Sequence, residues 1–324
     1  MARPIIAASI RVRHRTERIA ISSPGDFGLG PRVPFAGADG LLPYCLDFVR
    51  RRAVYAGGVD VKGAQDAPFF YLYLRRHAER LVSVPWEHGA LTAETRAPIF
   101  LFSPGRCGST LLSALLSNAG IPNVSEPDFY TQATMALPAH RFNPFRARIG
   151  AAAAAMGRDL AAALDGVPVV KLRAESCRAP ELLVAPEEPR TLFMTRGFEA
   201  WARSNQRAFR NGPAKTVGKY LSALKGYAWL RANSRCHVMR YEDLVAAPEA
   251  TARALGAFLG RDISGAAAVA TMKEDSQRGT PLEQGARGDL PGWEQRFQET
   301  MALWNSAKVR RLREGLGAED LCAG

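Results

Sequence analysis

From residue 98 onward, short apolar runs alternate with longer stretches in which apolar residues recur at helical spacing. Four of these runs are too short for a helix, and we expect each to form a buried strand. They lie at residues 99–103, 167–170, 191–195 and 236–240. Buried strands that alternate with helices are typical of βαβ units, in which the strands pair in parallel. The pattern therefore predicts an α/β fold with a central parallel sheet flanked by helices.

The first part of the chain follows no clean period, and glycine and proline interrupt it often. Alternate positions over residues 10–14 carry Ile, Val and His, as in a half-buried strand. Residues 69–81 follow a proline and predict a short amphipathic helix. We expect residues 1–97 to form an N-terminal elaboration that packs on a main domain of residues 98–324.

Composition is that of an ordinary globular protein, since 47% of the 324 residues are hydrophobic and 23% are charged. The net charge is +12, from 43 lysines and arginines against 31 aspartates and glutamates. Such an excess favours an anionic ligand, a nucleic acid or an anionic membrane surface. The basic residues are spread along the chain without the interleaved aromatics of a nucleic-acid motif. We therefore expect no nucleic-acid partner, and a basic face that is largely solvated.

Membrane and disulfide signals are both lacking in the sequence. No apolar run approaches the roughly 18 residues that span a bilayer, and the start of the chain does not resemble a signal peptide. The five cysteines are scattered, and none stands in a C-x-x-C pair. This pattern predicts reduced thiols, neither a disulfide framework nor a zinc site, and a cytoplasmic protein without an integral membrane segment.

Positive charge follows three of the four predicted strands. Arg106 lies in the loop after the first strand, Lys171 directly follows the second, and Arg196 directly follows the third. In an open parallel sheet, ligands bind beyond the carboxyl ends of the strands. Three cations at one edge indicate a site for an anion.

The loop at residues 103–110, S-P-G-R-C-G-S-T, joins the first predicted strand to an apolar helix. Glycines let backbone N–H groups converge on an anion, and the helix N-terminus adds partial positive charge. A glycine turn before a helix is common, so the layout alone leaves an ordinary tight turn as an equal alternative. The candidate phosphate-binding residues are Gly105, Arg106, Cys107, Gly108, Ser109 and Thr110.

The residues of this loop distinguish between two families. They depart from the nucleotide-hydrolase signature G-x-x-x-x-G-K-[ST], because Gly108 is followed directly by Ser109 and the cation stands two positions earlier. They resemble instead the 5′-phosphosulfate loop of sulfotransferases that use 3′-phosphoadenosine 5′-phosphosulfate (PAPS), particularly the bacterial and tyrosylprotein types, which read R-[ST]-G-[ST]-T-L. Residues 106–111, R-C-G-S-T-L, differ from that pattern only at Cys107. The resemblance, over about residues 98–315, implies a P-loop-type three-layer sandwich that transfers a sulfuryl group from PAPS to an acceptor hydroxyl or amine.

A second phosphate site is implied by the same resemblance. In this family an Arg at a strand end and a Ser eight residues later bind the 3′-phosphate of the donor, and Arg196 and Ser204 match that spacing. Ser204 would lie about two turns into the helix that follows. Both side chains would then reach one phosphate if the helix is angled across the sheet edge.

Two later stretches also resemble the family. Residues 240–244, R-Y-E-D-L, match a segment after the last sheet strand, where we expect a structural corner. Arg287 and Gly288 resemble the loop that closes over the 3′-phosphate and adenine. Arg278 with Gly279 is an alternative for that role.

Glu126 is the candidate general base. A helix over residues 109–118 would lead away from the loop by about 15 Å, and an extended segment over residues 121–125 would return by about 16 Å. Glu126 would then lie at the sheet edge, where bacterial and tyrosylprotein relatives carry a Glu proposed as the base. Cytosolic relatives use a His in K-T-H-L-P, whereas this chain reads K-L-R from Lys171. Lys171 is expected to stabilise the transferring group or the leaving phosphate.

Two alternatives remain, a P-loop kinase or nucleotide hydrolase, and a catalytically degenerate binding protein with the same fold. Kinases hold Mg²⁺ through an Asp at a strand end, whereas these strand ends carry Lys171 and Arg196, so we expect no metal. The acceptor, whether a small molecule, a glycan or a lipid, is left open, as is the oligomeric state. Residues 1–97 and 129–148 are candidates to line or cover the acceptor pocket, with a role in the core as an equal alternative for the aromatic residues of 129–148.

Overall fold

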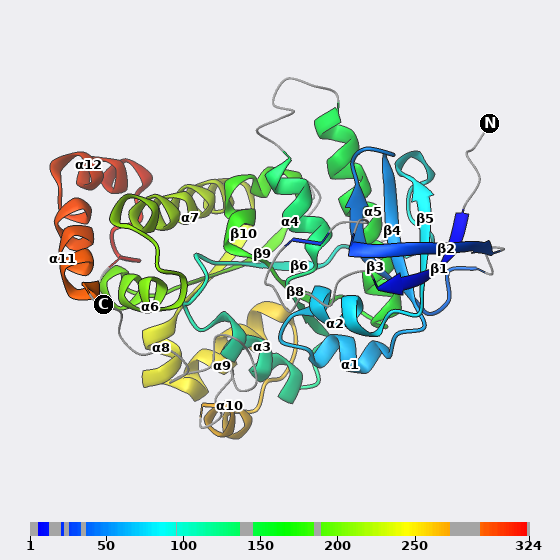
Figure 1. The fold of residues 1–324 in the computed structure, drawn as a ribbon. Coiled ribbons are helices and arrows are strands. Elements are labelled where there is room, and N and C mark those ends of the chain that lie inside the picture. The colour runs from blue at the N-terminus through cyan, green and yellow to red at the C-terminus, as the bar shows by residue number, and fades with distance from the viewer. Residues whose placement is uncertain are drawn as a thin grey trace. The chain divides into compact units, whose positions relative to one another are not determined.

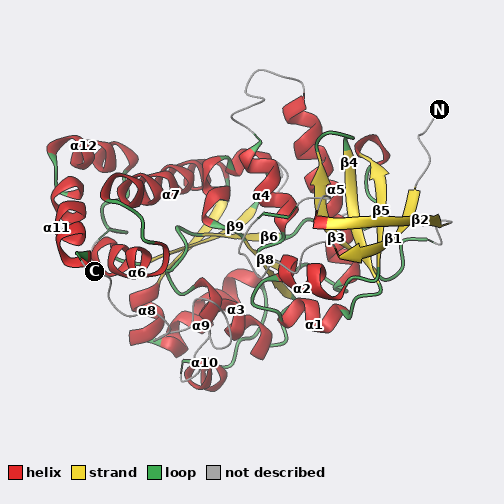
Figure 2. Ribbon diagram, in the orientation of Figure 1, coloured by secondary structure: helices red, strands yellow, loops and turns green. Residues whose placement is uncertain are grey.

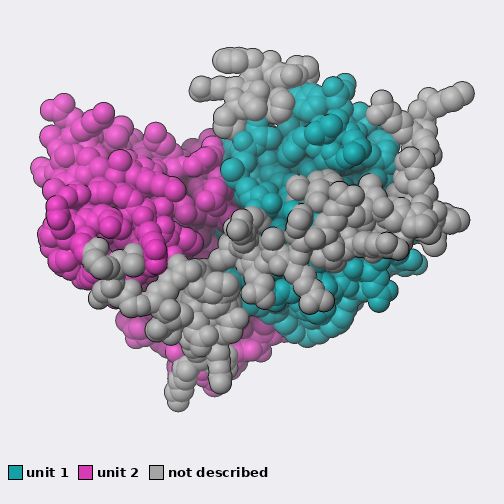
Figure 3. Space-filling model, viewed as in Figure 1, with its two compact units in different colours: residues 1–100, 122–172, 179–187 teal, residues 101–121, 173–178, 188–324 magenta. Residues whose placement is uncertain are grey.

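The computed structural model describes most of the chain as helices and strands (Figure 1). The described residues are 6–12, 21–22, 26–33, 37–94, 96–136, 145–184, 189–272 and 292–322. They form two compact units (Figure 3). The first consists of residues 1–100, 122–172 and 179–187, and the second of residues 101–121, 173–178 and 188–324. The first unit thus includes residues from both sides of the predicted boundary at position 98.

The predicted parallel sheet is confirmed, with five strands in the order β10-β9-β6-β8-β7. Its strands are β6 (Ile99–Phe102), β7 (Asn123–Ser125), β8 (Val169–Lys171), β9 (Arg190–Thr195) and β10 (Arg235–Arg240). The pairs β9–β10 and β7–β8 are parallel. Helices flank the sheet, with α7 on one side of β10 and α9 on the other (Figures 1 and 2). The α/β fold expected from the short apolar runs is therefore present.

The described part of the second unit contains several helices. They are α3 (Ser109–Asn118), α6 (Phe198–Phe209), α7 (Pro213–Asn233), α8 (Tyr241–Ala246), α9 (Pro248–Leu259), α10 (Gly265–Thr271), α11 (Trp293–Trp304), α12 (Ala307–Leu316) and the 3-10 turn η4 (Ala174–Arg178). An aromatic cluster fixes α6 among its neighbours, because Phe198 stacks on Trp304 with ring centroids 3.7 Å apart and Trp201 lies 4.8 Å from Tyr220. Buried aromatic pairs of this kind add to the stability that area burial provides.

A second, antiparallel sheet occupies the first unit, in the order β2-β1-β5-β4-β3. Its strands are β1 (Ile6–Val12), β2 (Phe27–Val33), β3 (Leu41–Asp47), β4 (Arg52–Gly57) and β5 (Arg80–Pro85). The helices of this unit are α1 (Val61–Asp66), α2 (Phe70–His77), α4 (Asp128–Met135) and α5 (Phe145–Ala163), with the 3-10 turns η2 (Trp86–His88) and η5 (Pro180–Leu182). Every residue of β3 is buried, and α4 and α5 contact that strand. The strand expected over residues 10–14 overlaps β1, whereas β2 and β3 contain Pro31 and Pro43, and a proline argues against assigning an apolar run to a strand.

The helix predicted over residues 69–81 is too long at its C-terminal end. It ends at His77, and the next residue, Ala78, already has an extended backbone with ψ of 130°. Leu81 lies in β5, where it is opposite Ala56 of β4 and Ala8 of β1. Leu81 stands seven residues after Leu74, a helical spacing, although it belongs to the following strand, so the end of the helix was misplaced.

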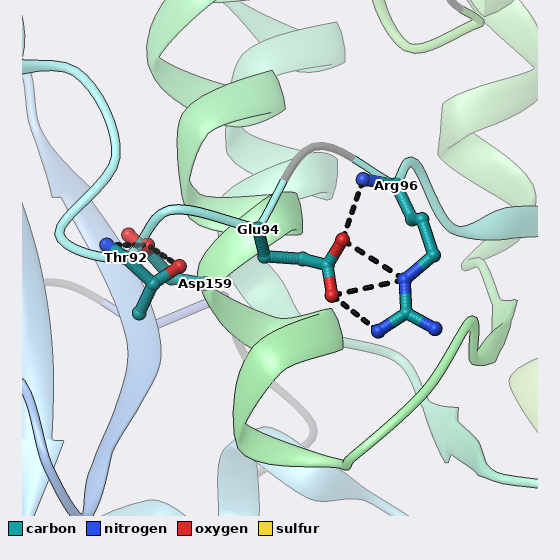
Figure 4. A network of polar contacts seen from close by, with 4 residues as sticks. All are labelled: Thr92, Glu94, Arg96 and Asp159. Atoms are coloured by element: carbon teal, nitrogen blue, oxygen red, sulfur yellow. Dashed lines mark hydrogen bonds and ion pairs between the residues drawn. The ribbon is translucent and has the colours of Figure 1, made fainter.

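The connection from the first sheet to β6 is hydrogen-bonded to α5 (Figure 4). The Asp159 carboxylate accepts from the backbone N–H and the hydroxyl of Thr92, both at 2.9 Å, and from the Tyr55 hydroxyl at 2.8 Å. Glu94 accepts from Arg96 through both guanidinium nitrogens that face it.

No helix in the described part of the chain is long and apolar enough to cross a membrane.

Candidate functional site

The loop between β6 and α3 has an unusual backbone. Gly105, Arg106 and Gly108 all have positive φ, at 72°, 56° and 87°. Glycine adopts this region freely, whereas for arginine it is uncommon. Gly108 is also the N-cap of α3 and carries no side chain that could cap the first turn. A glycine loop that leads into an uncapped helix N-terminus is suited to bind an anion.

Side chains from neighbouring elements fix this loop in place. The indole Nε1 of Trp201 in α6 donates to the Gly105 carbonyl at 2.6 Å. The Cys107 thiol is fully buried and donates to the carbonyl of Met194 in β9 at 3.4 Å. Cys107 is the position at which the loop departs from the R-[ST]-G pattern, and its thiol fills the donor role that a hydroxyl could also fill. The Ser103 hydroxyl accepts from the Gly105 N–H at 3.2 Å, so the loop is held before any ligand binds.

Tyr241, at the start of α8, connects the loop to the second predicted phosphate site. A Cβ atom on Gly108 would lie 2.4 Å from the Tyr241 ring, so only glycine leaves room for it. The guanidinium of Arg196 lies over the same ring, 4.5 Å from its centroid. Glu242 accepts a hydrogen bond from the Gly197 N–H at 3.0 Å. The structural corner expected at residues 240–244 is therefore present, and it packs against both candidate phosphate sites.

The structure brings Ser204 together with the loop. Arg106 Nε donates to the Ser204 hydroxyl at 3.2 Å, and both residues are half-buried. Arg196 directly follows β9, and its carbonyl accepts from the Tyr220 hydroxyl at 2.6 Å. The Arg196 Nε is buried and lacks a hydrogen-bond partner among the described residues. Arg106 and Ser204 thus meet at the glycine loop, Arg196 lies on the Tyr241 ring that faces Gly108, and the buried Arg196 Nε is a donor for which a charge-assisted partner would be favourable.

Glu126 and Lys171 lie in the first compact unit and form an ion pair. Glu126 directly follows β7 and Lys171 ends β8, and Ser125 and Lys171 are partners in this parallel pair. The Lys171 ammonium lies 3.3 Å from Glu126 Oε1, and the side chains are only 5% and 15% exposed. The Glu126 N–H also donates to the Lys171 carbonyl at 2.7 Å. The sequence predicted two separate roles for these residues, and the structure shows that they touch.

The other predicted site residues lie in the first turn of α3 or outside the described part of the chain. Ser109 is buried and Thr110 half-buried, both in the first turn of α3. Arg287, Gly288, Arg278 and Gly279 lie outside the described residues. Sequence reasoning missed Trp201, because a single tryptophan in a helix carries no signal that it will hydrogen-bond to a loop 96 residues earlier.

Known proteins similar to this chain were found by comparison of structures. A scan against protein-family models and a search of the curated proteins both found no match. Among solved structures, the sulfotransferase domain from the curacin biosynthetic pathway is 15% identical over 69% of this chain and 99% of its own, with a TM-score of 0.44. The sulfotransferase domain of the Synechococcus PCC 7002 olefin synthase is 16% identical over 70% of this chain and 96% of its own, with a TM-score of 0.41. Mouse sulfotransferase SULT7A1, complexed with PAP, is 14% identical over 68% of this chain and 90% of its own, with a TM-score of 0.39.

Proposed function

We propose that this protein is a sulfotransferase that moves a sulfuryl group from PAPS to an acceptor hydroxyl or amine. The observation that carries the proposal is the fixed glycine loop with its two cations. Arg106 belongs to the loop and hydrogen-bonds to Ser204, while Arg196 lies over the ring of Tyr241. The residue pattern R-C-G-S-T-L at 106–111 resembles a phosphosulfate loop rather than a nucleotide-hydrolase loop.

The residues present suit a donor with two separate phosphate groups. Residues 105–110 would hold the 5′-phosphosulfate through backbone N–H groups and the α3 N-terminus. Arg196 and Ser204 would hold the 3′-phosphate, and the buried Nε of Arg196, which has no partner among the described residues, supports this assignment. PAPS supplies an activated sulfuryl group with 3′-phosphoadenosine 5′-phosphate (PAP) as its leaving group.

The acceptor side of the reaction is assigned to the Glu126–Lys171 pair. Glu126 would take the proton from the attacking hydroxyl or amine, and its ion pair with Lys171 (3.3 Å) holds the carboxylate in one orientation. Lys171 would also bring positive charge to the transferring group or the leaving phosphate. Phe69, whose ring centroid lies 5.9 Å from the Lys171 ammonium, supports the expectation that residues 1–97 line the acceptor pocket. A small molecule, a glycan or a lipid would each suit an aromatic lining.

Thermal unfolding with and without nucleotide tests this proposal. PAP should raise the melting temperature in the absence of Mg²⁺, because a ligand at about 100-fold its Kd stabilises the folded chain by about 2.7 kcal/mol. A kinase or nucleotide hydrolase should instead respond to ATP with Mg²⁺ and not to PAP. A response to ATP with Mg²⁺ alone, or to neither nucleotide, would overturn the sulfotransferase assignment.

A further inference from the structure

Glu126 has a backbone conformation that its surroundings must enforce. Its φ is +62°, a left-handed value that is uncommon for any residue with a side chain. Such conformations persist where neighbouring contacts over-determine them. On one side the Glu126 N–H is bonded to the Lys171 carbonyl at 2.7 Å. On the other side Pro127 is the N-cap of α4, which begins at Asp128.

Gln132, about one turn into α4, is bonded to an edge strand. Its Oε1 accepts from the backbone N–H of Leu46 at 2.7 Å, and its Nε2 donates to the Leu46 carbonyl at 3.3 Å. Leu46 belongs to β3, the last strand of the antiparallel sheet. The outward polar groups of an edge strand normally pair with another strand or with water. Here a single buried amide, 7% exposed, satisfies both groups of one strand residue.

The same amide also holds Ser22. Gln132 Nε2 donates to the Ser22 carbonyl at 2.6 Å, and the fully buried carboxylate of Asp128 accepts from the Ser22 N–H at 2.5 Å. The Ser22 hydroxyl in turn accepts from Arg75 at 2.6 Å. Asp128 and Gln132 are four residues apart and so lie on one face of α4. Asp128 and Gln132 therefore bind the backbone N–H and the carbonyl of the same residue, Ser22.

We infer that Asp128 and Gln132 are positioning residues that fix Glu126 as the base. This inference rests on the function proposed above. The two side chains fasten the start of α4 to Ser22 and Leu46, and the turn at Glu126 connects that fastened helix to β8 through its own N–H. The N-terminal region, which lies outside the family resemblance, would then have a role in the reaction that does not require it to touch the donor.

Amide hydrogen exchange at Glu126 tests the inference without any assay of activity. Gln132→Met keeps the size of the side chain but removes its donor and its acceptor. We expect the Glu126 amide to exchange about tenfold faster, since the segment that holds it is released. Thr134→Val is the matched control, because Thr134 is buried in the same helix and, among the described residues, its hydroxyl donates to carbonyls of that helix, those of Tyr130 and Thr131. Exchange at Glu126 should be unchanged in this control.

Gln132→Glu provides a second variant should the methionine variant fail to fold. It retains an acceptor for the Leu46 N–H but loses the donors to the Ser22 and Leu46 carbonyls, and its carboxylate would face both oxygens, so faster exchange is expected here as well. If Gln132→Met and Gln132→Glu both leave exchange at Glu126 at the level of Thr134→Val, the positioning role is refuted.

Turnover then links the positioning residues to the reaction. With water as the acceptor, release of PAP from PAPS should slow in Gln132→Met, while the affinity for PAP stays within about twofold. In a Glu126→Gln background the same substitution should have no further effect, because residues that act through one group are not additive. Additive losses would show that Gln132 acts independently of Glu126 and would refute the positioning role. Full turnover in Glu126→Gln by itself would instead refute the base, and the exchange experiment would still stand.

Discussion

Arg106 Nε donates to the hydroxyl of Ser204 at 3.2 Å, across 98 residues of sequence. This bond fixes the orientation of a loop arginine whose own φ of 56° is unusual. The sequence resemblance assigned these two residues to different phosphates of one donor. Their direct contact brings the two predicted phosphate sites into one cluster, so changes at either site should affect the same nucleotide.

Arg196→Ala should weaken PAP binding by one to two decades. The substitution removes a charge-assisted contact worth about 1.5–3 kcal/mol. Arg203→Ala is the matched control, because Arg203 belongs to the following helix but lies over the Phe297 ring at 4.3 Å. Titration calorimetry with PAP should therefore separate the two variants. Equal affinities in both would remove Arg196 from the site.

Trp201→Phe should also weaken PAP binding, by about three- to tenfold. Phenylalanine keeps a ring in the aromatic cluster but loses the indole N–H that donates to the Gly105 carbonyl at 2.6 Å. Trp304→Phe, in the same cluster, keeps a ring for the stack on Phe198 and should bind PAP normally. If both variants lose affinity equally, packing rather than the loop bond is the cause.

Much of the parallel sheet was predictable because its strands are short, continuous apolar runs with a loop directly after each. The motif at 103–110 is local in the sequence, so its residues and their order were readable without any tertiary contact. The antiparallel sheet was predictable only at residues 10–12 of β1, because β2 and β3 each contain a proline, Pro31 and Pro43. A proline within an apolar run argues against assigning that run to a strand.

The side chains that hold the site residues in place could not be identified from the sequence either. Trp201 reaches the loop across 96 residues, and Gln132 reaches Leu46 across 86. Both are side-chain contacts from helices to backbone groups distant in sequence, and nothing in the local sequence of Trp201 or Gln132 distinguishes them from core residues. The Glu126–Lys171 contact depends on the register of β7 against β8, in which Ser125 is opposite Lys171. Register is set by tertiary packing and could not be derived from spacing along the chain.

Gly108→Ala should destabilise the fold and reduce the affinity for PAP together. The new methyl group would lie 2.4 Å from the Tyr241 ring, on a backbone with φ of 87°. Overpacking and strain of this kind cost about 1–3 kcal/mol. Gly212→Ala is the control, since a methyl group at that position would meet no atom within 4 Å and the φ of Gly212 is −72°. Thermal melts should show a clear loss for Gly108→Ala and little change for the control.

His237 should make the stability depend weakly on pH. Burial against Phe258, with ring centroids 5.1 Å apart, lowers the pKa of this imidazole in the folded chain. The unfolded chain therefore binds more protons near the ordinary pKa of about 6.5. Stability from this group is present above that pH and decreases as the pH falls below it. His237→Phe should make the melting temperature depend less on pH between about pH 7 and pH 5. The difference from the wild-type chain should be under about 2 °C, because the ring is half-exposed.

Glu126→Gln should abolish most turnover and leave nucleotide binding intact. The glutamine oxygen can still accept from the Lys171 ammonium, which lies 3.3 Å from Oε1 in the wild-type chain, so the local geometry should persist. What is lost is the ability to take a proton, which in general base catalysis is worth about 10²–10⁴-fold in rate. Release of PAP from PAPS should slow by that factor, while the Kd for PAP stays within about twofold. Glu181→Gln, which alters the ion pair with Arg146 in the same unit, should retain turnover. A Glu126→Gln variant as active as this control would place the base on another residue, because an amide cannot accept the proton that the reaction releases.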